Sequence, residues 1–305
     1  MRRLLLTGAA LCLLAAPLPA QSALSVVVMD PLAAPLSCPC VKGYAQRKYE
    51  ALAKHLEKQL GREVRLTFAE SLKVALKGDA KDEAHVIIGK HSVVLADAAE
   101  VERRVRPVAS LTGKDGLTTQ AGLIVVPAGD AAQRVVDLQG YRVLFGPADS
   151  DEKHKAAIAL LRSQGVEWQG QIETCQACSD GATKILELGD DIRAAAVISS
   201  YAQPLLQGCG TIKKGDLRVV GETKPVPFVT AFVDRGLSAQ EQSAVQDALL
   251  EVGAHPPLCQ ALETLVGFLP WEEPEQAPQP QRGRKRRQRR DKRAAEQAAG
   301  PAKKK

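Results

Sequence analysis

Short apolar runs alternate with segments of helical periodicity along most of this chain. Residues 25–30 (SVVVMD) and 85–89 (HVIIG) are apolar runs with the length of a buried strand. Between them, residues 43–60 repeat apolar side chains at helical spacing until Gly61, and a short helix is expected at 71–77. Because alternating strands and helices are typical of parallel sheets, this pattern predicts a sheet covered by helices on both faces.

A polar segment rich in turn signals, residues 112–120, interrupts this pattern. A second set of strands and helices follows, from an apolar run at 123–126 to a strand at 217–220. The extended segment 225–233 (PVPFVTAFV) then leads into a helix at 238–252. The chain is therefore predicted to form two α/β lobes that are joined by two crossings.

The boundaries of the lobes follow from these crossings. We expect residues 21–115 and 225–270 to form lobe 1, and residues 116–224 to form lobe 2. In lobe 1, Ser238 begins a capping box, the pattern that starts many helices. A final helix at 258–269 is expected to pack on the same lobe.

Residues 137–155 (DLQGYRVLFGPADSDEKHK) are the most informative segment of lobe 2. They predict a buried strand at 141–145, a Gly-Pro turn, and a helix that opens at Asp149 or Ser150. The spacing of Asp149 and Glu152 is that of a capping box. Loops that join the carboxyl end of a strand to the amino end of a helix hold ligands in open α/β sheets, so this loop is a candidate ligand-binding loop.

The two ends of the chain differ from the rest in composition. Residues 1–20 place two arginines before an apolar run and small residues, which is the pattern of a secretory signal peptide. Residues 271–305 are rich in Pro, Glu and Gln and then in bases, and we expect this tail to be disordered. Within it, residues 282–305 hold 12 Lys/Arg against two acids. The overall charge of +6 therefore comes from the tail.

An exported, soluble protein, periplasmic or otherwise extracytoplasmic, is the class that these features favour. With 45% hydrophobic residues the chain can fill two cores, and no later segment is long and apolar enough to span a membrane. Without Cys12, which lies in the signal peptide, six cysteines remain. An even number of cysteines in an oxidising compartment makes disulfides the default interpretation.

Three segments carry a pattern that can be matched to a known family. They are residues 136–150 (VDLQGYRVLFGPADS), residues 188–197 (LGDDIRAAAV) and the run Val226-Pro227-Phe228 after a strand. Together with the signal peptide and the two lobes, they resemble the periplasmic phosphonate/phosphate-binding family, the solute receptors of ABC transporters. The likeness covers about residues 25–255.

This resemblance implies a two-lobed periplasmic-binding-protein fold of type II, in which each lobe is a mixed, mostly parallel sheet flanked by helices. It also implies a small ligand, such as a phosphonate, phosphate or related oxyanion, and a permease partner in the inner membrane. We expect a monomer. In the family, small hydroxyl residues follow the position of Ser150, whereas this chain has Asp151 and Glu152, whose carboxylates would repel an oxyanion.

Candidate ligand-binding side chains lie in loops that follow predicted strands. They are Tyr44, Lys90, His91, Ser92, Ser150 and Tyr201. Hydroxyl groups could bond a small polar ligand, and Lys90 could neutralise an anion. Structural roles are the alternative, since Tyr44 can begin the buried face of the first helix and Ser92 can cap the third.

Two cysteine pairs also follow predicted strands, one in each lobe. They are Cys38 and Cys40 in lobe 1, and Cys175 and Cys178 in lobe 2. Four thiolates from the two sides of a cleft would suit a metal ion or a metallo-cofactor, with His91 as a further ligand. Disulfides are the alternative, and a thiol oxidoreductase is a third hypothesis.

Enzyme motifs are missing from the sequence. It contains no Gly-x-Ser-x-Gly, no phosphate-binding P-loop and no His-Glu-x-x-His, so a non-enzymatic binding protein is expected. The basic tail could contact an anionic surface such as lipid headgroups, wall polymers or nucleic acid. A solvated tail without a specific partner is the alternative.

Overall fold

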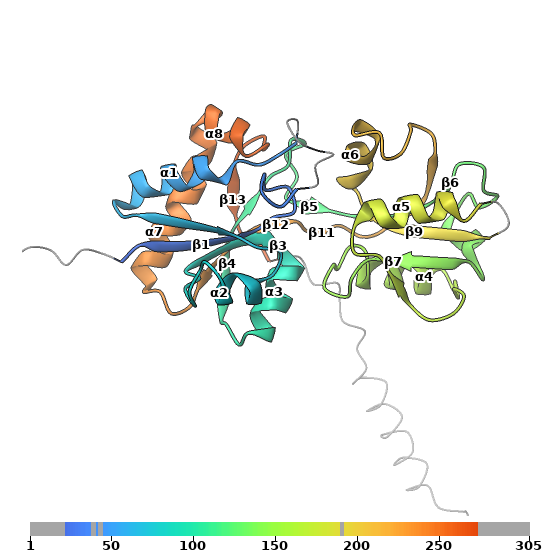
Figure 1. Ribbon diagram of the computed structural model, residues 1–305, viewed down its shortest axis with the longest axis horizontal. Helices are drawn as coiled ribbons and strands as arrows, with labels where there is room; N and C mark the ends of the chain where they lie inside the picture. The colour runs from blue at the N-terminus through green and yellow to red at the C-terminus, as the bar shows by residue number, and fades with distance from the viewer. Residues whose placement is uncertain (1–21, 38–40, 42–44, 190–191, 274–305) are drawn as a thin grey trace, which may run out of the picture. The chain divides into compact units, whose positions relative to one another are not determined.

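The computed structural model describes residues 22–37, 41, 45–189 and 192–273, which form two mixed sheets flanked by helices (Figure 1). The mixed α/β fold predicted from the sequence is confirmed. We call the first sheet with its helices lobe 1, and the second sheet with its helices lobe 2. The predicted signal peptide, and all but the first residues of the predicted tail, lie outside the described residues.

The sheet of lobe 1 has six strands in the order β13-β4-β12-β3-β1-β2. Strand β1 runs parallel to β2 and β3, whereas β12 is antiparallel to β3 and β4, and β13 is antiparallel to β4. The strands are β1 (Leu24–Met29), β2 (Val64–Phe68), β3 (Val86–Lys90), β4 (Val105–Leu111), β12 (Val229–Asp234) and β13 (Phe268–Pro270). Every residue of β1 is buried, because helices cover both faces.

The helices of lobe 1 pack on the sheet through two apolar cores. One core joins the sheet to α1 (Tyr49–Leu60), α7 (Ala239–Leu250) and α8 (Pro256–Ala261), and a single turn, η3 (Glu251–Ala254), connects the last two. The other core joins the opposite face to α2 (Leu72–Lys77) and α3 (His91–Glu100). Figure 1 shows α1 and α8 on one side of the sheet and α2 and α3 on the other.

Predicted start and stop signals fix several of these helices. The Ser238 hydroxyl accepts a bond from Glu241 N at 3.2 Å, while the Glu241 carboxylate accepts one from Ser238 N at 3.0 Å. This is the predicted capping box. Ser71 caps α2 by accepting a bond from Val74 N, and Gly61, with φ of 64°, ends α1.

The sheet of lobe 2 has five strands in the order β10-β6-β9-β7-β8. Strands β7, β8 and β9 are parallel, and β6 runs antiparallel to β9 and β10. The strands are β6 (Gly122–Pro127), β7 (Arg142–Phe145), β8 (Glu173–Thr174), β9 (Ala194–Ser199) and β10 (Leu217–Glu222). The helical segments are η2 (Val135–Leu138), α4 (Lys155–Ser163), α5 (Cys178–Glu187) and α6 (Ala202–Gly208).

Two short strands connect the lobes. Strand β5 (Thr119–Gln120) pairs antiparallel with β11 (Val226–Pro227). The chain leaves the sheet of lobe 1 after β4 through β5 and returns to it from lobe 2 through β11 (Figure 1). The paired connection places loops from both sheets opposite one another.

The final segment of lobe 1 differs from the prediction. In place of one helix at 258–269, α8 ends at Ala261 and β13 follows at Phe268–Pro270. Glu263 and Gly267 both adopt positive φ, which a helix does not permit, and Phe268 pairs with Leu111 at the edge of the sheet. Leu265, Val266 and Leu269, which the predicted helix would have buried, are exposed, so long-range pairing rather than the apolar spacing decided the element.

Candidate functional site

A cavity of about 500 Å³ lies between the carboxyl ends of strands from both lobes. On the side of lobe 1 its wall includes Met29, the last residue of β1, and Lys90, the last residue of β3. On the side of lobe 2 it includes Ser150, Cys178 and Tyr201, which follow β7, β8 and β9. This is the edge at which open α/β sheets bind ligands.

An ion pair joins the two lobes beside this cavity. Lys90 Nζ lies 2.7 Å from Glu152 Oε1 and donates a bond of 3.1 Å to the Ser150 hydroxyl. The Ser199 hydroxyl donates to the same Glu152 oxygen at 2.6 Å. We call Lys90, Ser150, Glu152 and Ser199 the interlobe cluster. Its two charged side chains are 8% and 0% exposed, so the pair is shielded from water.

The loop that carries Glu152 is not the helix start that the sequence predicted. Residues 148–149 and 151–154 form turns, and α4 begins only at Lys155. The backbone oxygen of Ser150 accepts bonds from Lys153 N and His154 N, which tightens the turn. Instead of closing a capping box with Asp149, the Glu152 side chain turns inward to Lys90. The proposed capping box is therefore wrong, because a buried cation in the other lobe binds the carboxylate.

Close backbone approach holds this turn in place. Gly122 lies against the carbonyl of Glu152, and a Cβ at position 122 would be 2.0 Å from that oxygen. Gly146 similarly makes room for the aliphatic part of Lys153, whose Cβ would be 2.4 Å from an added Cβ. Both positions require glycine because an added Cβ would clash with its neighbours, and not because the backbone adopts a positive φ.

Lys153 is the feature of the cavity that sequence reasoning missed. It is 5% exposed and lines the cavity, and its ammonium group donates a bond of 3.3 Å to the backbone oxygen of Gln176. Within residues 22–37, 41, 45–189 and 192–273, no carboxylate forms an ion pair with it. The interlobe cluster thus neutralises Lys90, whereas Lys153 has no carboxylate partner among the described residues.

The predicted hydroxyl residues occupy different places around the cavity. The Ser150 hydroxyl binds Lys90, and the Ser92 hydroxyl accepts a bond from Asp151 N at 3.2 Å, so both help to join the lobes. Tyr201 lines the cavity and stacks on Phe228 with ring centroids 4.8 Å apart. Burial raises the pKa of Tyr201 well above its ordinary value, so its hydroxyl stays protonated.

His91 and Tyr44 need separate mention. The His91 ring stacks on Trp271 at 4.5 Å, and its Nδ1 lies 3.1 Å from the Thr230 hydroxyl in lobe 1. Burial lowers the pKa of His91 to about 4, so the ring is neutral at pH 7. Tyr44 lies outside the described residues.

The predicted cysteine pair of lobe 2, Cys175 and Cys178, follows β8 at the same edge. Cys178, the first residue of α5, lines the cavity, and its sulfur accepts a bond from Ser199 N at 3.4 Å. Cys175 and Cys178 carry free thiols, and burial raises the pKa of Cys175. Cys38 and Cys40 lie outside the described residues.

A second buried charge cluster lies within lobe 1. Asp30, directly after β1, accepts bonds from Arg47 Nη1 at 2.9 Å and from the Tyr49 hydroxyl at 2.6 Å. Arg47 also donates to the backbone oxygen of Leu262 at 3.1 Å. The position of Asp30 at a strand end was the available signal, but its partners are 17 and 19 residues away in the sequence. Asp30 also accepts a bond from Leu32 N at 3.0 Å, so the cluster holds part of the loop that lines the cavity.

A family model decides the identification. The model described as "ABC transporter, phosphonate, periplasmic substrate-binding protein" matches residues 43–277. The chain belongs to this family. The resemblance seen in the sequence is therefore confirmed, and this family of transport receptors is not a family of enzymes. No curated protein sequence matches the chain.

Solved structures of this type agree in fold. XAC2383 from Xanthomonas citri, solved bound to ATP, has a TM-score of 0.61 and 14% identity, covering 91% of this chain and 98% of its own. A binding protein component of an ABC phosphonate transporter from Pseudomonas aeruginosa has a TM-score of 0.61 and 12% identity, covering 82% of each chain.

A third solved structure was determined with a ligand. PhnD1 from Prochlorococcus marinus, in complex with methylphosphonate, has a TM-score of 0.59 and 13% identity, covering 82% of this chain and 93% of its own. At such identities the structures support the fold and leave the ligand of this chain open. Among the described residues, no helix has both the length and the apolar character needed to cross a membrane.

Proposed function

We propose that this protein is an extracytoplasmic receptor that binds a small anion with an apolar part in the cavity and delivers it to an ABC permease. The observation that carries the proposal is Lys153, a buried cation on the cavity wall that forms no ion pair within the part of the chain the structure describes. A buried ammonium group is costly unless it is paired, so an anionic ligand would compensate it.

The rest of the wall favours an anion that is small and partly apolar. Met29, Leu205 and Leu206 supply apolar surface, and Ser179 lies on the same wall. Relatives of similar fold were solved with methylphosphonate and with ATP, so phosphonates and phosphates are the classes to test first. The interlobe cluster already holds a carboxylate on Lys90, which leaves Lys153 as the anion-binding cation in our proposal.

Ligand-induced stabilisation tests the proposal. Methylphosphonate, inorganic phosphate and ATP would be added to the purified protein, and melting temperature and calorimetric affinity would be measured. We expect at least one of them to bind, and Lys153→Met to weaken it by about tenfold or more, because a charge-assisted bond contributes about 1.5–3 kcal/mol. Lys214→Met, an exposed lysine of lobe 2, is the matched control. Equal affinity in Lys153→Met and Lys214→Met would refute the role of Lys153.

A metal ion held by cysteine thiolates is the second candidate. Its support is the position of Cys178 on the cavity wall, three residues after Cys175. Thiolate pairs at this spacing suit Zn²⁺ or Cu⁺. Elemental analysis together with a thiol count, on protein isolated from its native compartment, tests this candidate, and protein that contains neither metal nor free thiols would exclude it.

A further inference from the structure

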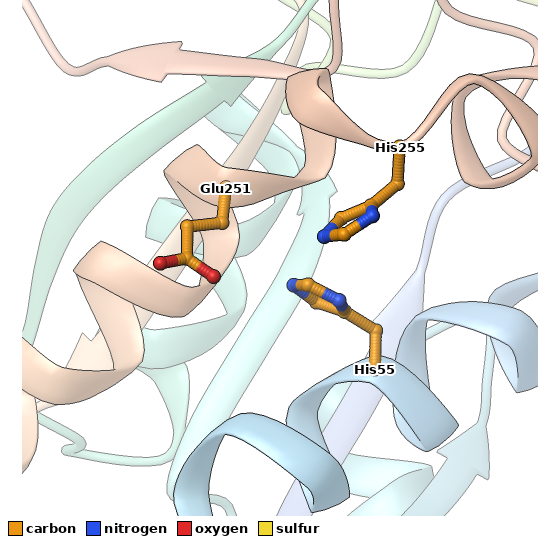
Figure 2. Close-up of side chains that lie close together, drawn as sticks. All are labelled: His55, Glu251 and His255. Atoms are coloured by element: carbon orange, nitrogen blue, oxygen red, sulfur yellow. The ribbon is translucent and has the colours of Figure 1, made fainter.

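Two histidines and a glutamate lie close together in lobe 1, and none of the three belongs to the cavity wall. His55 comes from α1, Glu251 is the first residue of η3, and His255 directly precedes α8. One ligand atom of each lies within 4.8 Å of the others. In Figure 2 the two imidazole rings lie next to each other, edge to face with their centroids 5.1 Å apart, and the Glu251 carboxylate points toward the same space.

The backbone that carries these side chains is held firmly. Helices α1 and α7 share the core that contains Leu52, Leu56 and Leu249. At the corner before α8, His255 N donates to Val252 O at 3.0 Å, and the backbone oxygen of His255 accepts bonds from the first turn of α8. Only side-chain rotation is therefore needed to adjust the three groups. Glu251 and His255 are exposed, so the protein interior does not block rotation of their side chains.

The electrostatic surroundings favour a cation at this place. Glu251 caps the carboxyl end of α7, where the helix dipole is negative. The Ala248 backbone oxygen lies 2.8 Å from His55 Nε2, which fixes the orientation of that ring. Gln59 donates to Oε2 of Glu251 and orients the carboxylate in the same way.

The ligand types select the class of metal. Two imidazoles and one carboxylate suit Zn²⁺, Ni²⁺, Co²⁺ or Cu²⁺, whereas Ca²⁺ and Mg²⁺ prefer oxygen ligands. Ligand atoms about 2.0–2.1 Å from a tetrahedral Zn²⁺ lie about 3.4 Å apart. In the protein the three ligand atoms lie at most 4.8 Å apart. Small rotations of the two exposed side chains would therefore bring them to the spacing that a bound metal ion requires.

We propose that His55, Glu251 and His255 form a surface site for one divalent transition-metal ion, with the remaining coordination positions open to water. Such an ion would connect α1 to the corner between α7 and α8. The proposal is independent of the ligand of the cavity, because none of the three residues lines it.

Calorimetric titration of the full chain with ZnCl₂ tests the site. The protein carries no affinity tag, and its thiols are alkylated so that cysteines do not compete. We expect binding of one equivalent and a rise in melting temperature, since an ion that binds only the folded state stabilises it. His255→Asn should weaken the affinity by at least tenfold and remove the thermal shift. Because His255 is exposed, this variant should fold normally.

Two further variants make the result specific. Glu251→Gln should also weaken Zn²⁺ binding, whereas Glu50→Gln, an exposed carboxylate of α1 outside the cluster, should leave it unchanged. Zn²⁺ binding of equal affinity and stoichiometry in His255→Asn would overturn the proposal, as would the lack of any binding by the unaltered protein. CaCl₂ should give no heat and no thermal shift.

Discussion

Replacing Lys90 by methionine is the most direct probe of the contact between the lobes. The substitution keeps an unbranched apolar side chain of nearly the same length but removes the charge. Glu152 would then remain 0% exposed with only the Ser199 hydroxyl on Oε1, while its Oε2 already lacks a hydrogen-bond partner among the described residues. A buried carboxylate without a cation is among the costliest groups in a fold.

The size of the effect follows from this burial. Breaking a buried pair on one side typically costs about 3–5 kcal/mol, whereas replacing both partners by apolar residues is often close to neutral. Lys90→Met should therefore lower the free energy of unfolding by about 3–5 kcal/mol. The double variant Lys90→Met/Glu152→Leu should recover most of that loss, because no charge is left in the interior.

Urea unfolding followed by circular dichroism measures these differences. If the two lobes open in Lys90→Met, water would reach Glu152 and the loss in free energy of unfolding would be smaller. The radius of gyration is therefore measured by small-angle scattering alongside the urea titration. The control is Lys73→Met, which removes an exposed pair with Glu100, and pairs of this kind contribute about 0–1 kcal/mol. If Lys90→Met costs no more than Lys73→Met and leaves the radius of gyration unchanged, the reasoning is refuted.

Two other predictions concern pH and packing. Burial lowers the pKa of His91 to about 4, below its value of about 6.5 in the unfolded chain. Between these two pH values the unfolded state binds more protons than the folded state. The free energy of unfolding should therefore fall as the pH drops from about 6.5 to about 4. His91→Phe keeps an aromatic ring beside Trp271 and should flatten that part of the pH profile in urea titrations; an unchanged profile would contradict this assignment. Gly122→Ala should destabilise the protein by about 1–3 kcal/mol or more, because the added Cβ would meet the Glu152 carbonyl. The control is Gly129→Ala, which should be tolerated because the space around Gly129 is open. Equal melting temperatures of the two variants would contradict the close approach at Gly122.

The sequence by itself determined the elements whose causes are local. The apolar run of β1, the capping box of Ser238 and Glu241, and the left-handed Gly61 at the end of α1 are all short-range patterns, and each is present in the structure. The family motif of residues 136–150 also lies within one stretch of chain, so it was visible without any knowledge of contacts.

Tertiary structure decided the chemistry of the cavity. Asp149 and Glu152 fit a capping box by spacing, but Lys90, 62 residues away from Glu152, binds that carboxylate instead. Lys153 gains its importance only because the same turn buries it on the cavity wall without a carboxylate partner among the described residues. The physical reason is that burial and charge pairing depend on which segments meet in space, and a local pattern of residues carries no information about distant partners.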